Sequence, residues 1–209
     1  LDRDLASVQE VRNLVAVAKK AQAELMRLDQ RRIDDIVLAM TEAAERNAEA
    51  LAKMAVEDTG FGVVRDKVTK NLFASRTVYE SIRNVKSIGV IREDREKRVW
   101  EAAVPVGVVA GLVPSTNPTS TVIFKSLISV KAGNAIVFSP HPSAVRCISQ
   151  TVRILSDAAC AAGAPQGVLG VMTLPTLPGT QELMKRVNLI LATGGTAMVR
   201  AAYSSGTPA

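Results

Sequence analysis

The sequence is poor in histidine and cysteine, and this excludes several kinds of site. Its one histidine, His141, leaves no Ser/His/Asp or Cys/His set of the hydrolase type to assemble. Its two cysteines, Cys147 and Cys160, fall in one predicted helix, thirteen residues apart, a spacing that matches no metal motif. Because thirteen helical residues span about 20 Å, a disulfide between them is not expected. We therefore predict reduced, buried thiols and no bound metal.

Long apolar runs are also absent. No stretch of about 18 apolar residues occurs, so a membrane-spanning helix is not expected. Charges from Asp2 onward interrupt the N-terminus, which is unlike a signal peptide. Aromatic residues make up 3% and hydrophobic residues 47%, a composition that favours layered α/β packing over an aromatic-rich sandwich. We therefore expect a cytoplasmic α/β protein.

The charge is moderately basic but dispersed. The formal net charge is +6, and positive residues alternate with acidic ones, as in "REDREKR" at positions 92–98, which we interpret as a solvated turn. Without a basic aromatic motif, nucleic acid is not an expected partner. A modest positive bias suits small polyanions such as dinucleotides and coenzyme A.

Helical periodicity dominates residues 1–86. Ser7 and Glu10 form an S-x-x-E capping pattern that predicts a helix start. Three apolar patterns with three-to-four spacing predict three helices, of which the third covers 64–82. The expected core positions are Val8, Val11, Leu14, Ala18, Ala21 and Leu25 in the first helix, Ile33, Ile36, Val37, Met40, Ala44 and Leu51 in the second, and Val68, Leu72, Val78 and Ile82 in the third.

From residue 87 onward, strands enter the pattern. Residues 87–104 predict a two-stranded β-ribbon with Trp100 packed under it, and we expect this ribbon to reach a partner domain or subunit. Residues 105–209 then alternate strands and helices, which predicts a Rossmann-like parallel sheet. Ligands of such sheets lie beyond the carboxyl ends of the strands. Three loops are expected there: "VPSTNPTS" (113–120), "SPHPS" (139–143) and "TGGTA" (193–197).

Each loop has a functional and a structural interpretation. The pair Gly194–Gly195 allows a pyrophosphate or nicotinamide to approach helical N–H groups, or only serves the turn, and the GxGxxG fingerprint is absent. His141 contacts a ribose or phosphate, or caps the next helix. Asn117 donates to a developing oxyanion, or satisfies loop carbonyls, which composition alone favours. Thr119 and Ser120 are expected N-caps.

In their order and spacing these loops resemble the aldehyde dehydrogenase superfamily, and specifically its CoA-acylating branch. That branch includes the aldehyde dehydrogenase half of bifunctional alcohol/aldehyde dehydrogenases and acylating enzymes of bacterial microcompartments. The matching segments are "VPSTNPTSTVIFKSLISVKAGNAIVFSPHPSA", "AAGAP", "NLILATGG" and "AAYSSGTPA", and "KMAVEDTGFGVVRDKVTKN" is similar to the family's N-terminal helical region. The similarity covers essentially the whole chain.

The resemblance implies a two-step reaction. A cysteine thiolate attacks an aldehyde, hydride passes to NAD, and the resulting thioester is transferred to coenzyme A. Asn117 then has the oxyanion-binding role, and Ser139 stands where hydrolytic members usually carry a lysine for the adenosine ribose, which disfavours a hydrolytic enzyme. The expected cofactor-binding residues are Leu112, Val113, Pro114, Ser115, Thr116, Asn117, Ser139, His141, Gly194 and Gly195.

The resemblance also implies an incomplete aldehyde dehydrogenase fold. The family's nucleophilic cysteine lies in a second domain, further along than Ala209, and neither cysteine of this chain aligns with it. We therefore expect residues 1–209 to be a partial NAD/CoA-binding domain without activity of its own. Within it, 1–86 form a helical region, 87–104 an oligomerisation arm of a homo-oligomer, and 105–209 the Rossmann-like part.

Some alternatives stay open at this point. The alternative to part of an acylating aldehyde dehydrogenase is a non-catalytic module that binds a nucleotide or assembles with a partner. The aldehyde is not specified, because acetaldehyde, propionaldehyde, sulfoacetaldehyde and succinate semialdehyde would be distinguished by residues of the second domain. The expected location is the cytoplasm, with a bacterial microcompartment as the alternative.

Overall fold

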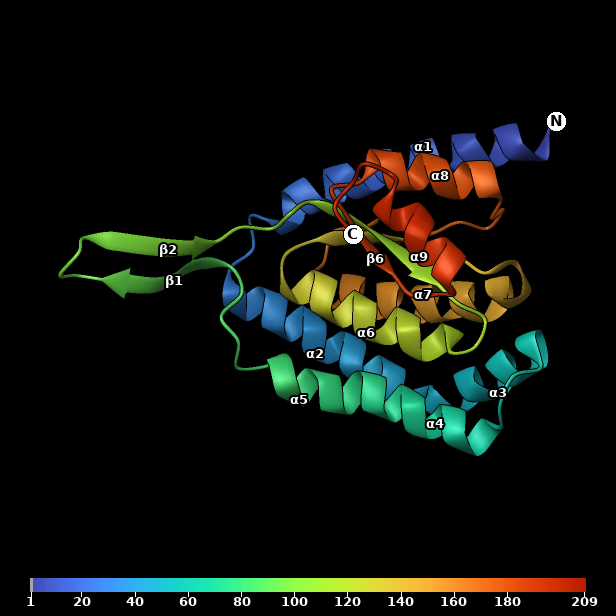
Figure 1. The fold of residues 1–209 in the computed structure, drawn as a ribbon. Helices are drawn as coiled ribbons and strands as arrows, with labels where there is room; N and C mark the ends of the chain where they lie inside the picture. The colour runs from blue at the N-terminus through green and yellow to red at the C-terminus, as the bar shows by residue number, and fades with distance from the viewer. Residues whose placement is uncertain (1) are drawn as a thin grey trace.

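The computed structural model describes residues 2–209, which form a parallel sheet between helices and a separate ribbon (Figure 1). The helices are α1 Arg3–Leu25, α2 Gln30–Arg46, α3 Ala48–Thr59, α4 Val64–Leu72, α5 Val78–Ile82, α6 Pro118–Lys131, α7 Val145–Ala161, α8 Leu177–Arg186 and α9 Thr196–Tyr203. The strands are β1 Gly89–Asp94, β2 Val99–Ala103, β3 Val108–Val113, β4 Ala135–Pro140, β5 Leu169–Val171 and β6 Leu189–Ala192. The expected α/β class is confirmed. No helix within 2–209 has the length and apolarity needed to cross a bilayer.

The main sheet has the strand order β5-β4-β3-β6, and all its pairs are parallel. The chain therefore adds strands to one side of β3 and then crosses to the other, as in the first four strands of a Rossmann sheet. In the register, Leu112 of β3 lies opposite Ser139 of β4 and Ala192 of β6. The loops that follow these three strands consequently leave the sheet side by side, at the point where the strand order reverses.

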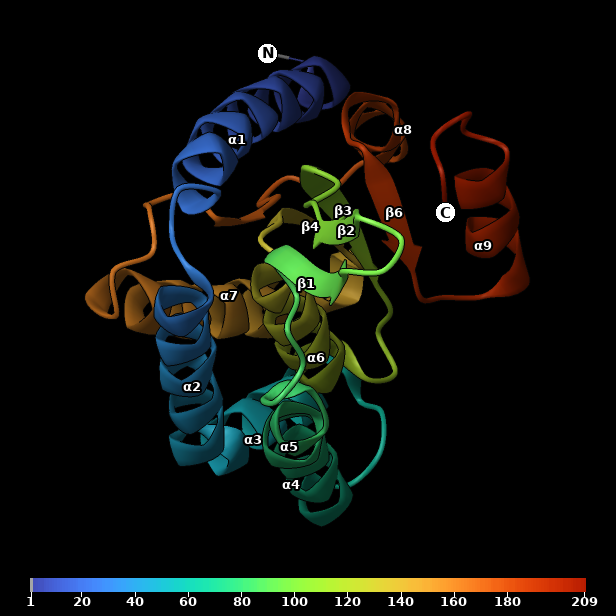
Figure 2. The same ribbon diagram turned by 90° about the vertical axis from the view of Figure 1, so that its left-hand side faces the viewer.

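The two faces of the sheet belong to two separate apolar clusters. Along β3, Val108 and Leu112 belong to the cluster with α1 and α8, whereas Val109 and Val113 belong to the cluster with α2, α6 and α7. Figure 2 shows α1 and α8 on one side of the sheet and α6 and α7 on the other. This alternation is the period of two that a β-strand imposes on its side chains, so the central strand is apolar throughout.

Helix α1 begins earlier than the capping pattern predicts. Asp2 is the N-cap, and its side chain accepts a hydrogen bond of 2.8 Å from the N–H of Asp4. Ser7 is buried inside the helix, and the Glu10 carboxylate accepts hydrogen bonds from backbone N–H groups of the turn at 173–174. The prediction that Ser7 and Glu10 form a capping box is therefore wrong, because the helix has already begun at Arg3 and the Glu10 carboxylate bonds a distant turn instead.

The second and third helical patterns are each interrupted. The second is broken at Asn47, which ends α2 and precedes α3. The third passes through a π-helical turn, Phe73–Thr77, between α4 and α5. Its expected core positions are only half-buried, because the face of α4 that turns inward is polar and carries Lys67 and Asn71.

Strands β1 and β2 form the expected antiparallel ribbon, which projects from the body of the molecule (Figure 1). The prediction that Trp100 packs under this ribbon is wrong, because Trp100 is 72% exposed. Every residue of the ribbon is exposed or half-buried, because no layer of the described chain covers either face.

Candidate functional site

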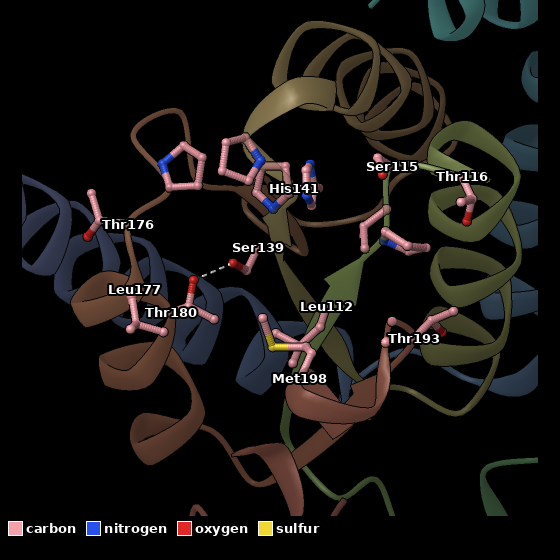
Figure 3. A pocket seen from close by; sticks show the side chains of 17 residues that line it. Leu112, Ser115, Thr116, Ser139, His141, Thr176, Leu177, Thr180, Thr193 and Met198 are labelled. Carbon is pink, nitrogen blue, oxygen red and sulfur yellow. Dashed lines mark hydrogen bonds between the residues drawn. The ribbon is translucent and has the colours of Figure 1, made fainter. Parts of the chain in front are cut away.

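The three expected loops meet beyond the carboxyl ends of β3, β4 and β6 and line a pocket of about 690 Å³ (Figure 3). Apart from His141, the lining residues contributed by 2–209 carry no ionisable side chain. Of the ten expected cofactor-binding residues, all but Asn117 line this pocket: Leu112, Val113, Pro114, Ser115, Thr116, Ser139, His141, Gly194 and Gly195. The sheet topology thus brings together residues that are up to 83 positions apart in the sequence (195 − 112 = 83).

A buried lysine holds the floor of this pocket in place. Lys125 of α6 is 2% exposed, and its Nζ donates hydrogen bonds to the carbonyl oxygens of Leu112 (2.8 Å) and Leu191 (2.6 Å). It therefore links the ends of β3 and β6, the two strands at the reversal point. No carboxylate of the described chain pairs with Lys125, and burial lowers the pKa of its ammonium to about 7.

On the β4 side, hydroxyl groups and the one imidazole line the pocket. The Ser139 Oγ and Thr180 Oγ1 atoms are hydrogen-bonded at 2.8 Å, which joins the end of β4 to α8. The His141 Nδ1 accepts a hydrogen bond from the N–H of Ser143 and caps the short turn Pro142–Ala144. The structural interpretation of His141 therefore holds, and the same ring also lines the pocket.

On the β6 side, the glycine pair opens helix α9. Gly195 is the N-cap of α9, with an ordinary φ of −68°. A Cβ built on Gly195 would meet no atom within 4 Å, so the fold itself does not require glycine there. The space beside this N-terminus is therefore available to a ligand that approaches the backbone closely.

Asn117 lies apart from the other nine residues. It lines a second pocket of about 560 Å³, enclosed mainly by apolar groups of α6 and of the segment 69–78. Asn117 is also the residue that precedes α6, whereas the predicted N-cap Thr119 donates instead to Asn71 Oδ1 at 2.8 Å. The prediction that Thr119 and Ser120 cap this helix is wrong, because Pro118 already occupies its first position.

The two pockets thus lie on either side of one short segment. Leu112 to Thr116 line the larger pocket, and Asn117 and Ser120 line the smaller one. The segment is held from α4, where the buried Lys67 donates from Nζ to the carbonyl oxygen of Thr116 at 2.8 Å.

The sequence did not reveal several lining residues. Pro175, Thr176, Leu177 and Thr180 line the larger pocket from α8 and the loop before it, and no local pattern distinguishes them from surface residues. Lys125 did carry a signal, because a single charge inside the apolar run "TVIFKSLIS" indicates a buried, hydrogen-bonded ammonium. The signal for Lys67 was weaker, because it occupies a position of the helical pattern where no apolar residue is expected.

Neither cysteine has the setting of a nucleophile. Burial, followed by the negative charge of Asp58, raises the pKa of the Cys147 thiol to about 12. Cys160 lies near the C-terminal end of α7, about 20 Å along the helix from Cys147 and towards the opposite edge of the sheet from the pocket. Neither residue lines either pocket.

Comparison with known proteins places this arrangement in a family. The sequence profile described as "Aldehyde dehydrogenase family" matches residues 3–208. The chain is 47% identical over 207 residues to the bifunctional aldehyde-alcohol dehydrogenase AdhE of Escherichia coli K12, covering 98% of this chain and 23% of that protein. It thus spans about a quarter of that relative.

Solved structures agree with the sequence comparison. An acetylating aldehyde dehydrogenase from Geobacillus thermoglucosidasius matches with a TM-score of 0.98 and 59% identity, over 99% of this chain and 46% of that one. A propionaldehyde dehydrogenase from Rhodopseudomonas palustris, solved with bound CoA and an acylated cysteine, matches with a TM-score of 0.80 and 28% identity, over 95% of this chain and 45% of that one. The first of these two proteins is named an acetylating enzyme. The chain belongs to the aldehyde dehydrogenase family.

Proposed function

We propose that the protein to which this chain belongs converts a short-chain aldehyde, NAD⁺ and coenzyme A to an acyl-CoA, NADH and a proton. The observation that carries the proposal is the pair of pockets on either side of the segment 112–117. One is lined by nine of the expected cofactor-binding residues and the other by Asn117. The acetylating activity in the name of the Geobacillus thermoglucosidasius protein supports the same reaction.

In this proposal the larger pocket binds the dinucleotide. The pocket fits such a group, because Gly195 leaves open space beside the N–H groups that begin α9, where phosphate oxygens are favourably bound. Ser115, Ser139 and Thr176 add hydroxyl groups for sugar oxygens. The bound nicotinamide supplies the hydride acceptor. The residues of this chain orient the bound dinucleotide, so that its nicotinamide faces the segment that ends at Asn117.

Asn117 has the complementary role of an oxyanion donor. Its amide lies at the rim of a mostly apolar pocket, where a hydrogen bond to a developing negative charge is stronger than in water. The attacking thiolate is assigned to a residue outside this chain, because the Cys147 thiol is buried with a raised pKa and Cys160 lies far from both pockets. We therefore propose that the 209 residues alone bind NAD but do not turn over.

The test is a turnover assay on the longest natural polypeptide that contains this chain. Acetaldehyde, propionaldehyde, sulfoacetaldehyde and succinate semialdehyde are each supplied with NAD and coenzyme A. We expect NADH absorbance to rise with one or more of them, with an equal amount of the acyl-CoA detected by mass spectrometry. Free acid in place of the thioester would indicate a hydrolytic enzyme instead. NAD binding without NADH from any aldehyde would favour the nucleotide-binding module.

A second experiment uses the chain of 209 residues alone. Calorimetric titration should detect NAD binding to it, while the same aldehydes should yield no NADH. NADH formation by this chain would contradict the assignment of the nucleophile to a residue outside it.

A further inference from the structure

The side chain of Asn117 is held from helix α4. Lys70 Nζ donates a hydrogen bond of 3.0 Å to Asn117 Oδ1. One turn earlier, Lys67 Nζ donates to the carbonyl oxygen of Thr116 at 2.8 Å. The two lysines are three positions apart, so they project from the same side of α4 towards consecutive residues of the loop.

This contact determines which end of the amide is free. A lysine ammonium has three donors and no acceptor, so it can face only the oxygen of an asparagine amide. With Oδ1 turned to Lys70, the Nδ2 donor is directed to the other side. Within residues 2–209, no hydrogen bond of the Nδ2 group is formed, and Asn117 and Lys70 both line the smaller pocket. A donor is therefore left for an oxygen atom that comes to lie beside Asn117.

The same two lysines make the surroundings of Asn117 positive. No ion pair of the described chain involves either of them: Glu49 of α3 pairs with Lys53, and Glu45 of α2 pairs with Arg76. Burial and then the charge of Lys70 lower the pKa of Lys67. An oxygen that becomes negative beside Asn117 is stabilised in such a field.

We infer that Lys70 is a positioning residue for the oxyanion donor: it fixes the Asn117 amide with Nδ2 towards the substrate oxygen and polarises that amide through Oδ1. The inference rests on the proposed function, because it needs an aldehyde oxygen that gains negative charge in the smaller pocket. Lys70 itself is exposed, so its hydrogen bond adds little to the stability of the fold. Replacing it is therefore expected to leave the protein folded.

The experiment is a double-mutant cycle in the full-length protein, with Lys70→Met, Asn117→Ala and both together. Asn117→Ala should lower kcat by about 100-fold, the scale of one lost oxyanion donor. Lys70→Met should lower kcat by about tenfold, with the KM for the aldehyde and for NAD within twofold of wild type. In the Asn117→Ala background, Lys70→Met should have no further effect, because its effect passes through the amide.

Two further variants separate positioning from structure. Lys70→Arg keeps a donor and a positive charge and should restore most of the lost kcat. Arg65→Gln, on the exposed part of α4, is the matched control and should leave both kcat and KM unchanged. The melting temperature of every variant is measured to confirm the fold.

The outcomes distinguish this inference from the function on which it rests. An unchanged kcat in Lys70→Met, or an equal loss of kcat in both backgrounds, would overturn the role of Lys70 and leave the proposed reaction intact. A wild-type protein that forms no NADH would overturn the proposed reaction, and the role of Lys70 with it.

Discussion

The buried Lys125 leads to a prediction about stability and pH. Its native pKa is about 7, lowered by burial, against 10.5 for the ordinary side chain. Below the native pKa the folded and unfolded chains both carry the proton. Between the two values the unfolded chain binds the proton and the folded chain does not, so the free energy of unfolding rises with pH. The contribution is complete above 10.5 and is lost as the pH falls to about 7.

The magnitude follows from this difference in proton binding. One bound proton corresponds to about 1.4 kcal/mol for each pH unit. Between about pH 7.5 and about pH 9, the wild type should gain about 2 kcal/mol relative to Lys125→Met, which cannot titrate. In Lys125→Met two carbonyl oxygens lose their donor, which changes the free energy of unfolding by the same amount at both pH values. This change therefore cancels when the two pH values are compared.

The assay is urea unfolding of both chains at these two pH values, with the free energies obtained by linear extrapolation. Lys20→Met, at an exposed position of α1, is the matched control for the loss of one positive charge. A difference between wild type and Lys125→Met that is equal at both pH values would refute the reasoning. It would mean that Lys125 keeps its proton in the folded chain across this range.

Two other predictions concern the ribbon and the turn before α9. Trp100→Ser should lower the mass of the full-length protein measured by light scattering and leave its melting temperature unchanged within a degree or so, because a tryptophan that is 72% exposed on a projecting ribbon suits a contact between subunits rather than the core. An unchanged mass would count against an oligomerisation arm. Gly195→Ala should weaken NAD binding by about tenfold, measured by calorimetric titration, without loss of stability, because an added Cβ fills only the open space beside the helix N-terminus. Unchanged NAD affinity would place the dinucleotide elsewhere.

Much of the fold was predictable because its strands and helices have regular periods. The four strands of the main sheet lie within residues 105–209, where alternation was expected, since strands buried on both faces are apolar runs bounded by turn residues. The meeting of the three loops also followed from parallel strand order alone. It needed no side-chain geometry, because the carboxyl ends of parallel strands lie at one edge of a sheet.

The remaining features depend on contacts between distant segments. Ser7 and Glu10 match a capping pattern, yet Ser7 is buried beside Gly179 of α8 and Glu10 bonds the loop at 173–174. Trp100 was assigned to an interior that the ribbon does not have. The separation of Asn117 from the other loop residues depends on Lys67 and Lys70, which lie about fifty positions earlier in the chain, and no local pattern links them.

The ribbon also divides the chain into two parts that stay joined through the core. A two-stranded ribbon with no further layer is only marginally stable in water, so it opens locally at a free energy well below that of global unfolding. Its turn carries Arg95, Lys97 and Arg98, which are exposed cleavage sites for trypsin. Yet helix α2, before the ribbon, packs in one apolar cluster with α6 and α7, after it. A chain cut at this turn would therefore remain a folded, non-covalent pair of fragments. A partner subunit bound to the ribbon would slow the cleavage of the turn by trypsin.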